Sequence, residues 1–110
     1  MNYDVHFTEL SYKTLAVLTR YMESFLGQEE AIRLGHQLLD FATNKLGDNP
    51  LQFPISHELE TLGITDYRVM LVDNYKILFR LDEKDKTSYV MAFLRQKQNT
   101  QELVYQITIL

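Results

Sequence analysis

The sequence predicts an α+β fold in which a short strand and two long helices precede three antiparallel strands. Three observations indicate this class. Apolar residues recur at helical spacing between residues 9 and 46. Alternating apolar residues and tight turns follow between residues 67 and 95. The short turns force these last strands into an antiparallel meander, and we expect both helices to pack on one face of the sheet.

A short strand is expected over residues 3–7, whose apolar side chains alternate with polar ones. Thr8 then offers an N-cap for the first helix. That helix ends naturally at Gly27, because glycine adopts the left-handed position after a helix at little cost. The predicted apolar stripe of the first helix comprises Leu15, Leu18, Met22, Phe25 and Leu26.

A second helix is expected from Gln28 to Gly47, before the helix-breaking Asp48-Asn49-Pro50. Gly35 lies inside it, where glycine costs roughly 0.5–1 kcal/mol relative to alanine. The position of Gly35 on the apolar stripe predicts close approach to the first helix in an antiparallel hairpin. That stripe comprises Ile32, Gly35, Leu39, Ala42 and Leu46.

The second half of the chain is predicted to be a loop over 48–66 followed by the meander. Its first two strands, 67–72 and 75–82, are joined by Asp73-Asn74, residue types that tolerate left-handed backbone. A last strand follows over 87–95. The tail 100–110 reads as either a short helix or an extended segment, and residues 1–110 are expected to form a single domain.

Charge is distributed unevenly along this acidic chain, whose formal net charge is −4. Residues 1–67 hold ten acidic and four basic residues, whereas residues 68–97 hold four acidic and seven basic ones. In the strand 75–82, alternation places Lys76 and Arg80 on the face opposite Tyr75, Ile77, Phe79 and Leu81. One sheet face is therefore expected to bury apolar surface while the other displays cations.

Several classes of chemistry find no support in the sequence. The chain contains no cysteine, which excludes disulfides and thiol nucleophiles. His6, His36 and His57 lack the spacing of metal ligands, so we predict no metal. The four scattered glycines form no phosphate-binding loop and the serines lack a nucleophile-elbow context, so we also predict no cofactor and no catalytic residue. The sequence has no secretory signal pattern and no apolar run of about 18 residues, so we expect a cytoplasmic protein without a membrane partner.

The remaining candidates for function are cations of the meander and its end. Such residues can simply keep a sheet face soluble, or they can hold carboxylates and phosphates, for which arginine on a rigid strand is well suited. The predicted recognition residues are Arg68, Lys76, Arg80, Arg95 and Lys97. A nucleic-acid binder usually shows a broader basic footprint, so an acidic peptide or an acidic protein surface is at least as plausible a ligand as nucleic acid.

Several passages, taken in order, resemble the RelE/ParE toxin superfamily of bacterial type II toxin–antitoxin systems. The most specific is Tyr67-Arg68 followed by the strand Tyr75–Asp82. The others are Thr8 before a long helix, Leu26-Gly27 before a helix carrying Ala31, Leu46–Pro50 with Phe53-Pro54, and Phe93–Asn99. Together they cover nearly the whole chain, and they imply the strand–hairpin–meander fold described above.

Within that superfamily the chain is most similar to ParE-type toxins. RelE-like members are ribosome-dependent endoribonucleases whose catalytic lysines lie just before the meander, where Ser56–Glu60 has two carboxylates and no lysine. Carboxylates there repel a phosphate backbone. The resemblance therefore implies a non-enzymatic, plasmid-stabilising type of toxin that arrests growth by poisoning DNA gyrase. Two alternatives remain: an mRNA endoribonuclease using Arg68, Arg80, Arg95 and Lys97, or a non-toxic member retained for partner binding.

The resemblance also implies a partner. The expected partner is a cognate antitoxin whose C-terminal segment wraps the helices and the sheet, covers apolar surface and meets the basic strands with carboxylates. Operator DNA is expected to bind only through that antitoxin.

Overall fold

The structure is a computed structural model that describes residues 2–101 and residue 103. Its elements, in order, are β1 (Asp4–Phe7), α1 (Glu9–Leu26), α2 (Gln28–Asp48), a 3₁₀ turn (Pro50–Gln52), α3 (His57–Glu60), β2 (Tyr67–Val72), β3 (Tyr75–Asp82) and β4 (Thr87–Arg95). The predicted 48–66 loop therefore contains the 3₁₀ turn and α3. Within the predicted tail, Thr100 and Gln101 begin a helical turn, whereas residues 102 and 104–110 lie outside the described residues.

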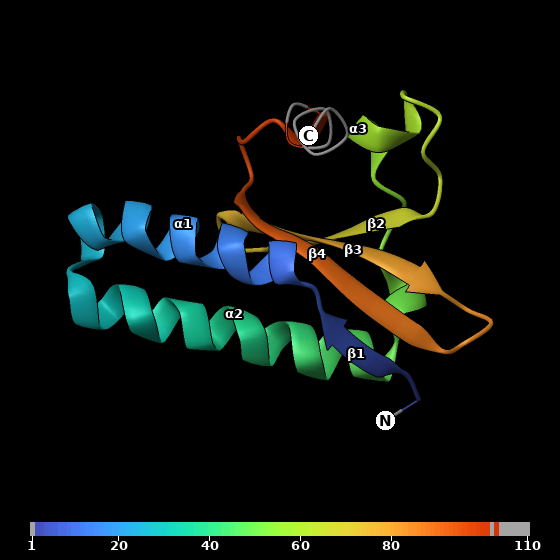
Figure 1. Ribbon diagram of the computed structural model, residues 1–110, viewed down its shortest axis with the longest axis horizontal. Helices are drawn as coiled ribbons and strands as arrows, with labels where there is room; N and C mark the ends of the chain where they lie inside the picture. Colours follow the sequence, from blue (N-terminus) through green and yellow to red (C-terminus); the bar gives the residue numbers. More distant parts are fainter. Residues whose placement is uncertain (1, 102, 104–110) are drawn as a thin grey trace.

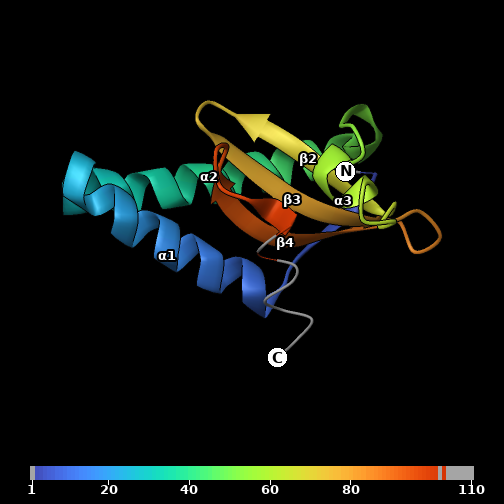
Figure 2. The same ribbon diagram turned by 90° about the horizontal axis from the view of Figure 1, so that it is seen from above.

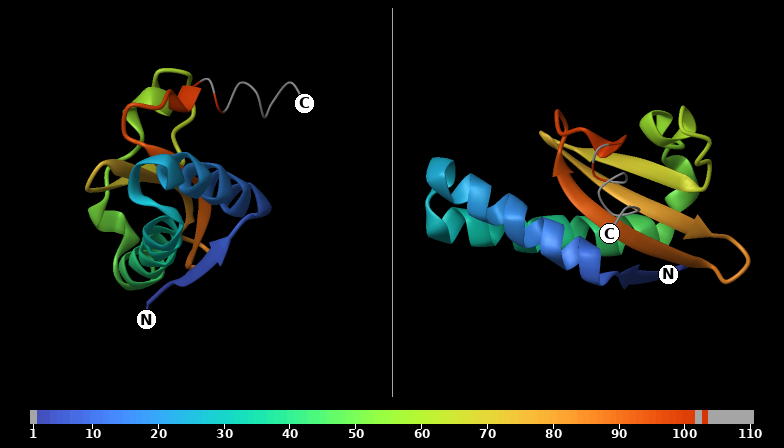
Figure 3. Two further views of the ribbon diagram at one scale, coloured as in Figure 1. Left: turned by 90° about the vertical axis from the view of Figure 1, so that its left-hand side faces the viewer. Right: turned by 45° about the horizontal axis from the view of Figure 1, so that its top comes forward.

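The four strands form one sheet in the order β1-β4-β3-β2. β2, β3 and β4 are antiparallel neighbours, as predicted, and β1 pairs with β4 in parallel. Figure 1 and Figure 3 show α1 and α2 side by side on one face, the helix face, with their far ends extending beyond the sheet. α3 and residues 96–101 lie over the opposite face, here called the α3 face. This arrangement confirms the predicted α+β class.

The helix boundaries follow local capping chemistry. The Thr8 hydroxyl accepts a hydrogen bond from the Ser11 backbone N–H at 3.1 Å and so caps α1. Gly27, with φ of 84°, donates its N–H to the Glu23 carbonyl and links α1 directly to α2. Among the described residues, none of the helices is long and apolar enough to cross a membrane.

The main core lies between the two helices and the sheet. The predicted apolar face of β3 contributes Tyr75, Ile77 and Phe79 to this core, with Leu81 packed at its margin. Their partners from the helices are Leu15, Leu18, Leu38, Ala42 and Leu46. A smaller cluster on the α3 face contains Leu59, Leu78, Ala92 and Leu94.

The predicted helix stripes are correct near the sheet and wrong at the far end of the hairpin. Phe25, Leu26 and Ile32 are exposed, because the hairpin extends past the sheet and nothing in the described chain covers them there. The helical period identifies an apolar face, but it cannot tell where the covering layer ends.

Gly35 is the point of close approach between α1 and α2, as predicted. A Cβ placed on Gly35 lies 3.1 Å from Thr19 Cγ2, which is closer than ordinary contact. We therefore expect Gly35→Ala to change stability little, because the clash offsets the roughly 1 kcal/mol gain in helix propensity. In a Thr19→Ala background the same substitution is expected to stabilise by about 1 kcal/mol. Urea unfolding of the four variants measures this coupling, and equal effects in both backgrounds contradict it.

A β-bulge interrupts β4 and changes which face its residues occupy. Phe79 pairs with Val90 and Leu78 with Ala92, so Met91 is the extra residue. Before the bulge Val90 points into the main core, and after it Phe93 does so. Consequently Arg95, two residues after Phe93, lies on the helix face.

Candidate functional site

The five predicted cations are divided between the two faces of the sheet and do not form one cluster. Strand register places Lys76 and Arg80 on the α3 face, and Arg68 and Arg95 on the helix face. Lys97 is exposed in the turn after β4. Arg95 and Lys97 line a common depression, together with Met22, Asn74, Tyr75 and Gln96.

Lys76 is not displayed, contrary to the sequence prediction. It is only 5% exposed, because α3 and residues 96–101 cover this part of the α3 face. Its ammonium group donates to Glu58 Oε1 at 2.9 Å and to the Gln98 carbonyl at 2.6 Å. Lys76 therefore holds two covering segments onto the sheet and is not a free recognition cation.

Glu58 completes this network from α3. Its carboxylate also accepts hydrogen bonds from the Thr100 N–H at 3.1 Å and the Thr100 hydroxyl at 3.0 Å. The Gln101 amide donates to the Glu58 carbonyl at 2.7 Å. One of the two carboxylates before the meander is thus neutralised by Lys76, and the network fastens the chain after β4 to α3.

The network makes a pH-dependent contribution to stability. Burial raises the pKa of Glu58, but hydrogen bonds from Lys76 and Thr100 and the Lys76 charge outweigh burial and hold that pKa below its ordinary value of 4.5. Because the folded-state pKa is the lower one, the stabilisation is complete above the unfolded-state pKa and is lost as pH falls through the folded-state pKa. We expect the stability difference between the wild type and Glu58→Gln, measured by urea unfolding, to shrink as the pH is lowered from 7 to about 3. A constant difference over that range contradicts this assignment.

Arg68 has a structural role on the helix face. Its guanidinium donates to the Phe53 carbonyl at 2.6 Å, and its backbone forms a bridge with Ile55. The residue therefore fixes the chain before α3 against β2. No other contact of the described residues assigns Arg68 to a recognition surface.

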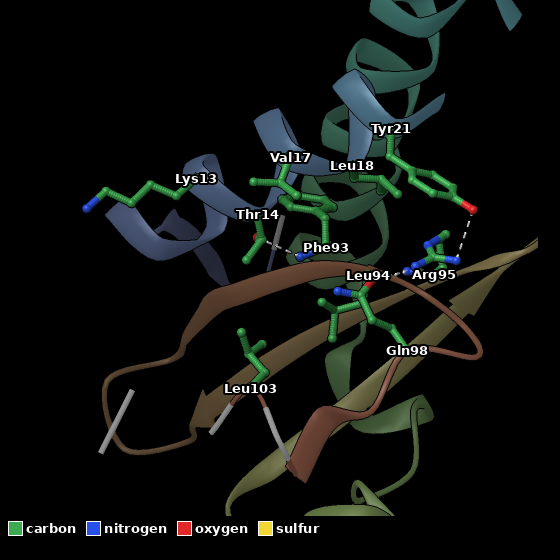
Figure 4. A pocket seen from close by; sticks show the side chains of 10 residues that line it. All are labelled: Lys13, Thr14, Val17, Leu18, Tyr21, Phe93, Leu94, Arg95, Gln98 and Leu103. Carbon is green, nitrogen blue, oxygen red and sulfur yellow. Dashed lines mark hydrogen bonds between the residues drawn. The ribbon is translucent and has the colours of Figure 1, made fainter. Parts of the chain in front are cut away.

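Arg95 lies in a groove between α1 and the end of β4, with a volume of about 310 Å³. Its guanidinium is 4.1 Å from the centre of the Tyr21 ring and donates to the Tyr21 hydroxyl at 3.3 Å. Figure 4 shows Tyr21 reaching from α1 toward Arg95, with Phe93 beside Val17 and Leu18. The α1–β4 groove is lined by Lys13, Thr14, Val17, Leu18, Tyr21, Phe93, Leu94, Arg95, Gln98 and Leu103.

The outer face of α1 extends this groove with solvent-exposed apolar side chains. Val17, Tyr21 and Phe25 follow one another at four-residue intervals and are 67%, 43% and 67% exposed. Cations flank the stripe: Lys13 and Arg95 line the groove, and Arg20 lines an adjoining depression with Val17. Among the described residues no carboxylate forms an ion pair with Arg20 or Arg95. Such a surface suits an apolar partner segment that also carries carboxylates.

Arg80 belongs to a row of side chains that crosses all four strands on the α3 face. Strand pairing aligns His6, Tyr89, Arg80 and Tyr67. The Arg80 guanidinium lies 4.6 Å from the centre of the Tyr89 ring. The His6 ring packs edge-on against Tyr89, with the two ring centres 5.5 Å apart. Burial and the charge of Asp66 raise the pKa of Tyr67, against the influence of Arg80.

Sequence reasoning identified Arg80 but missed its three neighbours. The alternation of β3 showed the face of Arg80, yet nothing in the spacing showed that β1 pairs in parallel with β4 and aligns His6 with Tyr89. In the part of the chain that the structure describes, no group of three or more histidine or acidic residues is arranged to hold a metal ion.

Comparison with solved structures shows the fold of bacterial RelE and ParE toxins. A chain of the chromosomal ParDE system of P. aeruginosa has a TM-score of 0.68 over 86% of this chain and 96% of its own, at 13% identity. A chain of the RelBE2 toxin–antitoxin complex of Mycobacterium tuberculosis has a TM-score of 0.63 over 87% and 100%, at 20% identity. The isolated E. coli RelE toxin gives 0.50 over 98% and 99%, at 14% identity. No protein-family model and no curated protein matches the sequence. The predicted resemblance is confirmed at the level of the fold.

Proposed function

We propose that this chain, which has the RelE/ParE fold, is the toxin of a type II toxin–antitoxin module and arrests growth in the cytoplasm by binding and poisoning DNA gyrase. A cognate antitoxin neutralises it by covering the α1–β4 groove. The solved structures that share the fold come from toxin–antitoxin systems, which supports the general class. The gyrase target rests on the features of the chain itself.

The observation that carries the proposal is the composition of the α1–β4 groove. Its ten lining residues include cations and apolar side chains but no carboxylate and no imidazole. Exposed apolar side chains flanked by cations suit a protein partner that offers apolar groups and carboxylates. The absence of lysine from Ser56–Glu60 also supports a protein target over RNA cleavage, and so does the pairing of Lys76 with Glu58.

Supercoiling of relaxed plasmid by purified gyrase tests the target. We expect the chain to inhibit supercoiling and to increase the amount of cleaved plasmid recovered after denaturation. Arg95→Glu and Lys97→Glu together reverse the two cations of the depression at the end of β4, and this is expected to weaken inhibition. Lys84→Glu, in the exposed turn before β4, serves as the matched control. Full gyrase activity at a large excess of the chain rejects the gyrase target.

A second candidate function, ribosome-dependent mRNA cleavage, is favoured by the row His6, Tyr89, Arg80 and Tyr67. The rings offer stacking surfaces for bases, Arg80 offers a charge for phosphate, and the exposed imidazole of His6 can exchange a proton. Primer extension on cellular mRNA after induction distinguishes the two functions. New cleavage ends that disappear with His6→Ala or Arg80→Ala support this alternative, whereas growth arrest without new ends excludes it. No growth arrest at all identifies a non-toxic binding protein.

A further inference from the structure

The α1–β4 groove has two walls of different construction. α1 supplies one wall, and the chain after β4 supplies the other through Gln98 and Leu103. This second segment, which comprises residues 96–101 and Leu103, is here called the strap. Figure 4 shows the α1 side chains on one side of the β4 ribbon, and Gln98 and Leu103 on the other side. The two walls are therefore separate segments that both border the end of β4.

Hydrogen bonds to the β4 backbone fix each wall. The Thr14 hydroxyl of α1 accepts a hydrogen bond from the Phe93 N–H at 3.0 Å. On the other side, Gln98 Oε1 accepts from the Arg95 N–H at 3.2 Å, and the Gln98 N–H donates to the Arg95 carbonyl at 3.0 Å. α1 is also anchored in the main core, whereas the strap reaches the smaller cluster through Leu103 at its margin. The position of the strap therefore depends more on polar contacts than that of α1 does.

Lys76 and Glu58 supply polar contacts beyond the start of the strap. At that start, Gln96 donates hydrogen bonds to the turn between β2 and β3. Farther along, the Gln98 carbonyl accepts from Lys76, and the Glu58 carboxylate accepts from both Thr100 donors. Figure 2 looks onto the α3 face, with the strap and α3 in front of the strands. Neither Lys76 nor Glu58 lines the groove.

Gln98 links this network to the groove. Its carbonyl is bound to the Lys76 ammonium group on the α3 face, at 2.6 Å. Its side chain is bound to the Arg95 N–H at the groove. Because one residue makes both contacts, a loss of the contact with Lys76 acts on the residue that forms the second wall.

We infer that Lys76 and Glu58 are positioning residues for antitoxin binding, because they hold the strap as the second wall of the α1–β4 groove. The inference rests on the proposed antitoxin site and is independent of the gyrase target. A partner segment that fills the groove contacts both walls. When the strap leaves its place, the partner keeps the α1 surface but loses Gln98 and Leu103, so its affinity falls. By thermodynamic reciprocity, a bound antitoxin holds the strap in place.

Amide hydrogen exchange of the full chain, followed by NMR, tests the strap without any partner. Lys76→Met removes the ammonium group and keeps an apolar side chain in its place. In this variant the Arg95 N–H, which the strap holds, is expected to exchange about tenfold faster relative to the Phe93 N–H, which α1 holds. Leu46→Ala destabilises the main core outside the groove lining, and it is expected to leave this ratio of exchange rates unchanged.

Isothermal titration calorimetry tests the effect on binding. The probe is the purified product of the small antitoxin gene that we expect beside the gene of this chain. Lys76→Met is expected to weaken binding about tenfold, and Leu46→Ala, measured where both variants are fully folded, to bind like the wild type. Glu58→Ala is expected to weaken binding in the same way. Glu60→Ala, which removes an exposed carboxylate of the same helix, is expected to leave the affinity unchanged.

An unchanged ratio of exchange rates in Lys76→Met overturns the positioning role. So does wild-type affinity of Lys76→Met and Glu58→Ala when Val17→Glu weakens binding, and in that case the antitoxin site itself stands. An equal loss of affinity in Leu46→Ala also overturns it. No binding by the wild type, or equal affinities of the wild type and Val17→Glu, rejects the proposed antitoxin site and this inference with it.

Discussion

Glu58→Ala is expected to lower the free energy of unfolding by about 2–3 kcal/mol at pH 7. The substitution removes the carboxylate from Lys76, whose side chain is 6% exposed, and from both Thr100 donors. Breaking a fully buried pair costs about 3–5 kcal/mol. We expect a smaller loss than this because Glu58 itself is partly exposed and Lys76 still donates a hydrogen bond to the Gln98 carbonyl. Urea unfolding measures the loss.

Two further variants test whether this loss of stability comes from the charge of Lys76 left without its carboxylate. Glu60→Ala removes an exposed carboxylate that lies 3.8 Å from His57, and is expected to change stability by less than about 0.5 kcal/mol. Lys76→Met in the Glu58→Ala background removes the uncompensated charge, so the double variant is expected to be more stable than Glu58→Ala alone. A Glu58→Ala protein as stable as Glu60→Ala rules out the network as an anchor.

Val17→Glu is expected to weaken binding of the antitoxin at least 100-fold, which corresponds to about 2.7 kcal/mol. Val17 is the first residue of the exposed stripe on α1 and lines the α1–β4 groove. A glutamate there must lose water when the groove is covered, and it repels the carboxylates that we expect on the antitoxin. Because Val17 is 67% exposed, the fold itself is expected to tolerate the change.

Isothermal titration calorimetry with the purified antitoxin measures the affinity. Ile32→Glu provides the matched control, since Ile32 is an exposed apolar residue on α2 outside the groove lining. In cells, the antitoxin is expected to rescue growth after induction of Ile32→Glu, provided that the variant is toxic. Equal affinities of the wild type and Val17→Glu refute the groove as the antitoxin site.

Much of the fold follows from local patterns in the sequence. Helical spacing and the capping residues Thr8 and Gly27 defined both helices, and Asp73 adopts the left-handed backbone that the turn prediction required. The alternation of β3 correctly gave the face that holds the helices. These features depend on near neighbours along the chain, where residue type and period are informative.

The candidate site depended on long-range arrangement, which local patterns do not encode. Lys76 lies on the predicted face of β3, but its burial results from α3 and residues 96–101, which the sequence did not place over it. The bulge at Met91 set the face of Arg95. The groove therefore emerged only when the register of β4 and the path of the chain after it were known.

The parallel pairing of β1 with β4 has a consequence for biosynthesis. Asp4 of β1 pairs with Thr87 of β4, so β1 cannot join the sheet until β4 has been synthesised. At about 5–20 residues per second, the intervening chain takes roughly 4–17 s to synthesise. During that interval the nascent chain lacks β4, one wall of the α1–β4 groove. The complete binding surface therefore forms only after β4 has been synthesised.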